Sequence, residues 1–253
     1  MKNNAYKLGL VSISFRDKTP LELIKAVRDA GLECIEWGSD VHAPFKDIQR
    51  LNDIARLQAE YGITCSSYGT YFHLGETPLE ELQDYIAAAK ILGTNVLRLW
   101  CGKKSADNYS AEERARFIAL CKQAAHIAEQ AGAVLCMECH RKTYTQKLSD
   151  ALYLMNEVNS PSFRMYWQPF QWQSIEQNLD YAENIAVYTE HIHVFQWKDT
   201  ARFSLYEGVE EWRAYLEKFT TPRTLLLEFM PDDSIASLER EANALKTIIG
   251  GLQ

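Results

Sequence analysis

A single unit recurs along this chain: a helical stretch ends at a glycine, and an apolar run follows at once. The unit is clearest in four segments, AVRDAGLECIEW, LQAEYGITCSSY, AKILGTNVLRLW and AEQAGAVLCME. Glycine readily adopts the left-handed conformation that ends many helices. A short run rich in Val, Ile and Leu is typical of a strand buried on both faces in a parallel sheet. The repeat therefore predicts helices that alternate with parallel strands.

Eight such units fit the chain. The strand signals begin 26 to 38 residues apart, near Leu8, Cys34, Thr64, Val96, Val134, Met165, His191 and Leu225. Amphipathic helices are expected between them, at 21–30, 48–61, 79–92, 111–131, 149–158, 175–188, 209–219 and 235–249. Thr19 before Pro20, and Ser110 three residues before Glu113, are signals for helix starts. The pattern predicts an α/β fold, a (β/α)8 TIM barrel.

A doubly wound open sheet is the alternative for the same alternation. That fold would carry a Gly-rich phosphate loop after its first strand, whereas here the first strand runs into Ile13-Ser14-Phe15-Arg16. No linker rich in Pro, Ser or Gly divides the 253 residues, a length common for one barrel. We therefore expect a single barrel domain over residues 1–253.

Composition narrows the class of function. A net charge of −7 argues against a nucleic-acid-binding protein, which usually has a basic face. No run reaches the roughly 18 apolar residues of a membrane span, and the apolar run at 8–15 has no cleavage site after it. We expect a cytoplasmic protein whose six cysteines are reduced core thiols. Cys136 and Cys139 form a CxxC, but three residues apart on a strand they would point to opposite faces.

Four polar residues close apolar runs in the second half of the chain: Glu138, Gln168, His193 and Glu228. The carboxyl ends of barrel strands meet at one rim, where the active sites of such barrels lie. A carboxylate at the end of a buried strand is costly unless it is paired, protonated or metal-bound. We therefore predict a divalent-metal site or an acid/base pair, with Glu138 and Glu228 as the catalytic residues. Salt bridges to Arg98 or Lys142 are the structural alternative.

Other polar and aromatic residues near the strand ends suit a pocket for a small sugar or polyol, because hydroxyls bond polar groups and C–H faces pack on aromatic rings. The candidate substrate-binding residues are Glu36, Trp37, His42, Tyr68, Arg98, Trp100, Lys103, His140, Gln171 and Gln196. An inward Arg98 needs a carboxylate partner, for which we predict Glu36 or Glu138. Tryptophans near strand ends serve either as sugar platforms or as packing between strands and helices: Trp37, Trp167, Trp172 and Trp197.

At these residues the chain resembles the xylose-isomerase-like barrel superfamily of sugar and sugar-phosphate isomerases, ketose 3-epimerases, inosose dehydratases and endonuclease IV nucleases. In the epimerase branch, a Glu ends strand five, an Asp strand six, the second His of H-x-H strand seven and a Glu strand eight. The matching segments here are MECH, YWQPFQ, HIHVFQW and LLLEF. IEWGSDVH, SSYGTYFHLG, VLRLWCGKKSAD and YWQP are similar to a subgroup described only as sugar-phosphate isomerase/epimerase-like.

The resemblance implies an isomerase or epimerase that acts on a small sugar or sugar phosphate, with the two glutamates moving protons next to a carbonyl. It also implies one divalent metal (Mn, Mg, Co or Zn) on Glu138, Gln168, His193 and Glu228. Gln168 stands where the family has Asp, which lowers the negative charge and predicts weaker metal binding. Gln171 stands where the family has a substrate-binding His.

Two other functions stay open: a sugar or polyol dehydratase on the same site, and a non-catalytic sugar-binding barrel without the metal. Gln168 and Gln171 favour the non-catalytic protein. An endonuclease is disfavoured, since it needs further His and Asp ligands. Barrels of this kind often dimerise, so a homodimer is also an expectation.

Overall fold

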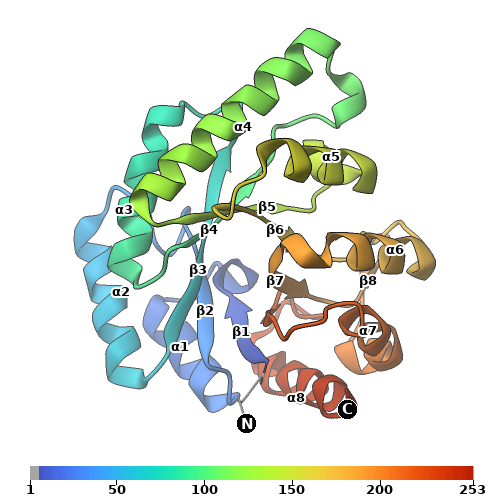
Figure 1. Ribbon diagram of the computed structural model, residues 1–253. Helices are drawn as coiled ribbons and strands as arrows, with labels where there is room; N and C mark the ends of the chain where they lie inside the picture. Colours follow the sequence, from blue (N-terminus) through green and yellow to red (C-terminus); the bar gives the residue numbers. More distant parts are fainter. Residues whose placement is uncertain (1–5, 253) are drawn as a thin grey trace.

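The computed structural model describes residues 6–252, and in it eight parallel strands form a closed barrel inside a ring of helices (Figure 1). The barrel strands are β1 (Lys7–Val11), β2 (Cys34–Gly38), β3 (Thr64–His73), β4 (Val96–Trp100), β5 (Val134–Glu138), β6 (Phe163–Trp167), β7 (Thr189–Val194) and β10 (Thr224–Leu227). The helices are α1 (Pro20–Asp29), α2 (Ile48–Tyr61), α3 (Leu82–Leu92), α4 (Ala111–Ala131), α5 (Leu148–Val158), α6 (Ile175–Ile185), α7 (Val209–Leu216) and α8 (Leu238–Gly250).

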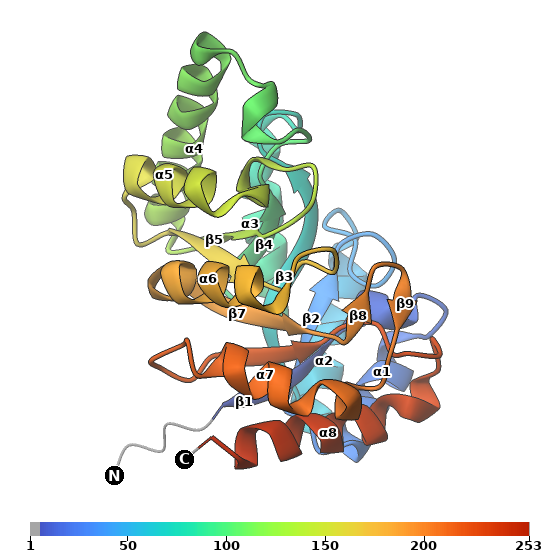
Figure 2. The same cartoon turned by 90° about the vertical axis from the view of Figure 1, so that its right-hand side faces the viewer.

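The strands follow one another around the barrel in chain order, and β1 pairs with β10 to close it. All eight pairings between barrel strands are parallel, so the predicted (β/α)8 fold is confirmed. The structure adds a short antiparallel hairpin, β8 (Trp197–Lys198) and β9 (Ala201–Arg202), which the sequence did not predict. Figure 2 shows this hairpin at the end of the barrel opposite the start of β1.

The predicted helix boundaries have local causes that the structure displays. Thr19 and Ser110 both form reciprocal capping boxes, in which the side chain accepts from the N3 backbone and the N3 glutamate accepts from the cap backbone. Helices α2, α3 and α4 end at glycines in the left-handed region, with φ of 69°, 87° and 66°. A residue with a Cβ would be strained there, so these glycines fix where each strand begins.

The inside of the barrel has two layers. Toward the amino ends of the strands it contains small apolar side chains such as Cys34 and Val96, the first residues of β2 and β4. Toward the carboxyl ends the buried side chains are mostly polar or charged. A separate and larger apolar core lies between the strands and the surrounding helices. The barrel interior is thus apolar toward one end and polar toward the other, and we call its polar part the polar chamber.

The cysteines belong to the packing, as predicted. All six are free and buried. Cys136 lies in the apolar layer inside the barrel, whereas Cys139 lies in the outer core. The two thiols of the CxxC therefore face different sides of the barrel wall, and burial raises the pKa of the Cys139 thiol to about 12.

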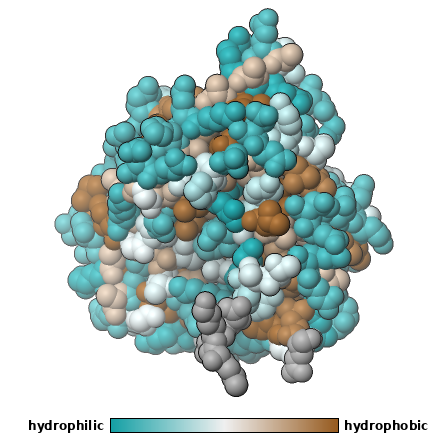
Figure 3. All heavy atoms as spheres, in the orientation of Figure 1, coloured by the Kyte–Doolittle hydropathy of each residue, from teal (hydrophilic) through white to brown (hydrophobic). Residues whose placement is uncertain are grey.

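The surface carries mostly polar side chains. In the view of Figure 3, apolar groups form separate patches among hydrophilic residues. Within residues 6–252, none of the helices combines the length and the apolar character that crossing a bilayer requires.

Candidate active site

A buried ion-pair network forms the floor of the polar chamber. Arg98 on β4 lies between Glu36 on β2 and Glu138 on β5, and its guanidinium donates to Glu36 Oε1 at 3.3 Å and to Glu138 Oε2 at 3.2 Å. The Arg98 and Glu36 side chains are 2% and 0% exposed. The sequence predicted one carboxylate partner for Arg98, and the structure provides both. Buried charges persist only when they are paired and hydrogen-bonded in this way.

Glu36 is fixed by further partners from across the barrel. The Tyr166 hydroxyl donates to Glu36 Oε2 at 2.6 Å, and the Ser67 hydroxyl does so at 3.0 Å. His193 Nε2 lies 3.4 Å from the same oxygen. Together with the charge of Arg98, these contacts outweigh the effect of burial and hold the pKa of Glu36 well below its usual range. Glu36 is therefore an ionised anchor beneath the site.

The other nitrogen of the His193 ring faces the chamber, where three oxygens surround it. His193 Nδ1 lies 3.2 Å from Gln168 Oε1, 3.5 Å from Glu138 Oε1 and 3.5 Å from Glu228 Oε2. The four predicted strand-end residues thus converge on one point. Within residues 6–252, Glu138, His193 and Glu228 form a cluster in which one ligand atom of each lies within 4.8 Å of the others, close enough to hold a metal ion together.

The Gln168 amide has a defined orientation. Its Nε2 donates to the Cys139 carbonyl at 3.0 Å, which leaves Oε1 facing His193. An amide in the reverse orientation would place its nitrogen against Nδ1 and its oxygen against a carbonyl oxygen. The hydrogen bond to Cys139 therefore presents a neutral oxygen at the position that the resemblance assigns to an aspartate.

Without a cation, the two glutamates have different pKa values. Burial raises the pKa of Glu228 to about 7, and repulsion from Glu138 adds to the rise while His193 opposes it. Burial acts on Glu138 too, but Arg98 and the hydrogen bond from His193 more than offset it and hold the pKa of Glu138 at about 2. The nearby Glu228 and Glu36 charges overcome the burial of His193 and raise its pKa to about 10. Without a cation, the surroundings therefore favour the protonated forms of His193 and Glu228.

The donor set fits a divalent cation. With bonds of about 2.1 Å, neighbouring ligand atoms in octahedral or tetrahedral sites lie roughly 3.0–3.4 Å apart. The 3.2–3.5 Å from His193 Nδ1 to the three oxygens are close to this spacing. Two carboxylates, one amide oxygen and one imidazole also suit Mn²⁺, Mg²⁺ or Co²⁺. The donor set and the distances from His193 Nδ1 are therefore compatible with a bound cation.

A cavity of about 400 Å³ opens above this cluster, and we call it the central cavity. Its lining residues are Ile13, Arg16, Tyr71, Arg98, Trp100, Glu138, His140, Gln168, Gln171, Phe195, Trp197, Glu228 and Phe229. The Trp100 indole donates to Glu138 Oε2 and stacks on the His140 ring at a centroid distance of 5.2 Å. The cavity therefore has both glutamates in its wall and aromatic faces beside them.

The structure does not bring every candidate substrate-binding residue to this cavity. Trp100, His140, Gln171 and Arg98 line it, whereas Lys103 is not among the lining residues. Trp37 and Tyr68 are buried on the outer side of the strands, where they bond Gln58 and the Ala43 carbonyl. His42 is buried against Ser12. Glu36 lies beneath the cluster, and Gln196 lines a neighbouring cavity.

Sequence reasoning missed several residues that shape the site. Tyr166 was detectable, because it lies two residues before Gln168 and so points to the same face. Ser67 has no comparable signal, since a serine in a strand is common. Phe195 and Phe229 follow the ends of β7 and β10 and line the cavity. They were not predicted because only polar residues and tryptophans or tyrosines at the strand ends were taken as candidates.

A closed parallel barrel with converging polar side chains at the carboxyl ends of its strands is a TIM barrel with its site at the usual end. The chain belongs to the xylose isomerase-like TIM barrel family, whose sequence profile matches residues 24–247. A curated relative, the 3-dehydroshikimate dehydratase of Bacillus anthracis, is 22% identical over 199 residues, which cover 74% of this chain and 70% of that protein.

Solved structures share the fold. The probable 3-dehydroshikimate dehydratase AsbF of Bacillus anthracis superposes with a TM-score of 0.80 at 17% identity, covering 95% of this chain and 98% of AsbF. D-psicose 3-epimerase of Clostridium cellulolyticum gives 0.72 at 15% identity, with coverages of 98% and 99%. A xylose isomerase-like TIM barrel protein of Mycobacterium smegmatis, solved with magnesium, gives 0.72 at 12% identity and 100% coverage of both chains.

Proposed function

We propose that the protein is a sugar isomerase or epimerase, in which Glu138 and Glu228 transfer protons at the carbon next to a carbonyl. The observation that carries this proposal is the approach of both carboxylates to one point. Each lies 3.5 Å from His193 Nδ1, each lines the central cavity, and they come from strands separated by β6 and β7. A small carbonyl compound above His193 would have one carboxylate on each side.

The two carboxylates are suited to different parts of such a reaction. Without a cation, burial raises the pKa of Glu228 to about 7, which suits a general acid or base near neutral pH. Glu138 stays ionised and is held in place by Arg98 and Trp100. In an epimerisation, one carboxylate removes the proton from the carbon and the other returns a proton on the opposite face.

A divalent cation on Glu138, Gln168, His193 and Glu228 would polarise the substrate carbonyl and make the adjacent C–H more acidic. The protein's own side chains position the two glutamates and form the walls of the cavity. Arg98 and Glu36 fix Glu138 and the His193 ring, while the aromatic side chains Trp100, Phe195 and Phe229 form apolar parts of the cavity wall.

The charge of the cavity supports a substrate without a phosphate group. Among the residues that line the central cavity, the two arginines are already paired with carboxylates: Arg16 with Asp40, and Arg98 with Glu36 and Glu138. No lysine is part of this lining. A phosphate would need free cationic donors, so a neutral sugar or polyol fits the lining better.

A dehydratase is the second candidate, because the chain is similar in both sequence and fold to 3-dehydroshikimate dehydratase. Dehydration can begin with the same step, removal of a proton next to a carbonyl. It diverges afterwards, when the second carboxyl group protonates a departing hydroxyl instead of the carbon. The same two glutamates therefore serve either outcome.

One experiment tests both candidates. Ketoses, aldoses and cyclic hydroxyketones are incubated with the Mn²⁺-loaded protein in D₂O and followed by NMR and mass spectrometry. Deuterium beside the carbonyl without loss of water supports the isomerase or epimerase, and a product lighter by one water supports the dehydratase. Glu138→Gln and Glu228→Gln should each slow exchange by at least about 100-fold, while the exposed Glu60→Gln should not. Binding without exchange would instead indicate the non-catalytic barrel.

A further inference from the structure

A second cavity, of about 390 Å³, lies beside the central one, and we call it the side cavity. It is formed by the segment between β6 and α6, two residues of α6, the segment from 195 to 199 and one residue of α7. Gln171, Phe195 and Trp197 line both cavities. No more than one layer of side chains therefore separates them. Each cavity is near the lower end of the roughly 300–1,000 Å³ typical of small-molecule sites.

The walls of the side cavity are held in place by buried hydrogen bonds. Asn178, which is 3% exposed, accepts from the Phe170 backbone N–H at 2.8 Å and donates to its carbonyl at 3.1 Å. The Asp199 N–H donates to the Gln171 carbonyl at 3.1 Å, which ties the hairpin to the loop after β6. The cavity is thus preformed, and a ligand would not have to order its loops.

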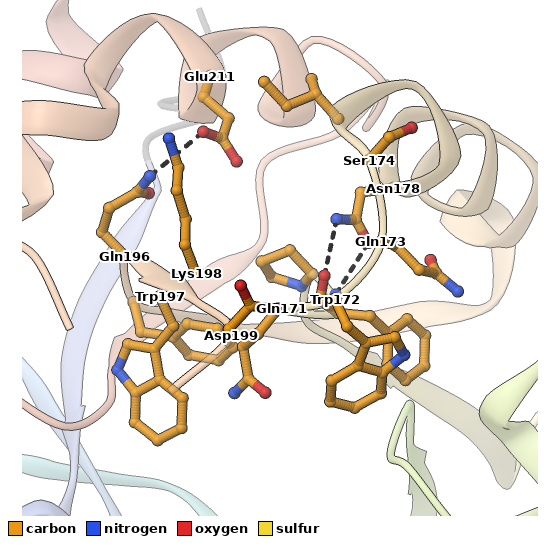
Figure 4. A pocket seen from close by; sticks show the side chains of 14 residues that line it. Gln171, Trp172, Gln173, Ser174, Asn178, Gln196, Trp197, Lys198, Asp199 and Glu211 are labelled. Atoms are coloured by element: carbon orange, nitrogen blue, oxygen red, sulfur yellow. Dashed lines mark hydrogen bonds between the residues drawn. The ribbon is translucent and has the colours of Figure 1, made fainter. Parts of the chain in front are cut away.

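The chemistry of the walls matches a sugar ring. Figure 4 shows the indoles of Trp172 and Trp197 on either side of the Gln171 amide. The Trp172 side chain is 43% exposed, although indole is a costly group to leave in water. Flat indole faces pack well against the C–H face of a pyranose, and the amide between them can bond its hydroxyls.

The remaining polar groups favour a neutral ligand. Gln196 donates to Glu211 Oε2 at 3.2 Å at the inner end of the cavity. Lys198 lies in the lining with two carboxylates, Asp199 and Glu211, so the lining itself has no excess of positive charge. Hydroxyl groups find both donors and acceptors there. The Arg141 guanidinium lies outside this lining, over the Trp172 ring at 5.2 Å from its centroid.

We propose that the side cavity is a second sugar subsite. The substrate is then a disaccharide or glycoside, whose reacting unit occupies the central cavity while its second ring occupies the side cavity beside Trp172. The assignment of the reacting unit rests on the function proposed above, but the binding of a second ring does not. Of the two cavities, Trp172 lines only the side cavity, so the binding of a second ring can be tested separately from the reaction in the central cavity.

The test compares calorimetric affinities of the Mn²⁺-loaded protein for matched pairs, in which maltose, cellobiose, trehalose and sucrose are each set against their component monosaccharides. At least one disaccharide should bind at least about tenfold more tightly than its components. Trp172→Ala should abolish that ratio and leave monosaccharide affinity unchanged. Tyr153→Ala, which removes an equally exposed aromatic ring on α5 (45% exposed), should leave both affinities unchanged.

Equal affinities for every pair, or no measurable binding of any disaccharide, would overturn the proposal. So would a disaccharide preference that survives Trp172→Ala. Failure of the proposed function would look different. If Glu138→Gln and Glu228→Gln both keep full deuterium exchange, the proposed proton-transfer roles are wrong. The ratio of disaccharide to monosaccharide affinity, and its dependence on Trp172, would still show whether the side cavity binds a second ring.

Discussion

Gln168 Oε1 lies 3.2 Å from His193 Nδ1, and the bond from the Gln168 amide nitrogen to the Cys139 carbonyl holds it there. A neutral oxygen is thus fixed where relatives with a resident metal are expected to have a carboxylate. The charge at this one position should control how tightly the cluster binds a cation.

Gln168→Glu should bind Mn²⁺ at least about tenfold more tightly than the wild-type protein, because it adds a negative charge with the same chain length. It should also be less stable without metal, since the Cys139 carbonyl loses its donor and a third carboxylate joins the cluster. Titration calorimetry and thermal unfolding measure the two effects. Gln171→Glu adds the same charge to the cavity wall and is the control. Equal gains in both variants would show that Gln168 is not a ligand.

Metal binding should strengthen as pH rises from about 6 to 8. Without a cation, the pKa of His193 is raised to about 10 and that of Glu228 to about 7, so both groups hold protons near pH 7. A cation requires their deprotonated forms and must displace those protons. Calorimetry in buffers of different ionisation enthalpy should detect proton release on Mn²⁺ binding. An affinity that is constant over this range would contradict the prediction.

Arg98→Met should lower the free energy of unfolding by about 3–5 kcal/mol, because Glu36 and Glu138 would lose their buried counter-charge. Arg98→Lys should cost less, since it keeps the charge but loses the forked geometry. Arg56→Met on the surface of α2 removes an exposed arginine and should change stability by no more than about 0.5 kcal/mol. Urea denaturation measures the stability of all three variants. An Arg98→Met variant as stable as the wild-type protein would show that Glu36 and Glu138 do not need the charge of Arg98.

Gly69→Ala should destabilise the protein by about 1–3 kcal/mol through steric crowding. A Cβ at this position would lie 2.5 Å from Glu36 Oε1 and 3.0 Å from Arg98 Nη2, so the ion pair would have to move. Gly250→Ala, near the end of α8, meets open space and should be neutral or slightly stabilising. Urea denaturation measures the difference, and Mn²⁺ affinity should fall in Gly69→Ala alone. Equal stability of the two variants would mean that Glu36 and Arg98 can move away from the added methyl group at no cost in free energy.

The sequence predicted the barrel well because its signals are periodic and repeated. Buried strand runs recur in all eight units, and helix-ending glycines and capping boxes agree with them in several. The convergence of Glu138, Gln168, His193 and Glu228 followed from the same logic, since strand ends of a closed parallel barrel share one rim. The β8–β9 hairpin could not be predicted in this way, because strands of two residues have no detectable period.

Side-chain direction was the weaker part of the prediction. Trp37 and Tyr68 each follow an inward-facing residue, Glu36 and Ser67, and alternation along a strand therefore turns them outward. Proximity to a strand end had made them candidates for substrate binding. His42 lies in a loop after β2, where alternation gives no guidance. The pairing of Tyr166 with Glu36 crosses the whole barrel, and no local pattern encodes it.

The contact between Glu36 and His193 joins residues 157 positions apart in the chain. Closing so long a loop is entropically expensive, and contacts of this range form late when a barrel folds. Glu36 and Arg98 come from the first half of the chain, whereas His193 and Glu228 come from the second. The second half supplies all four side chains of the cluster, but Glu36 and Arg98 from the first half hold His193 and Glu138 in place. Cation binding by a refolding chain should therefore reach its full strength only once the two halves have come together.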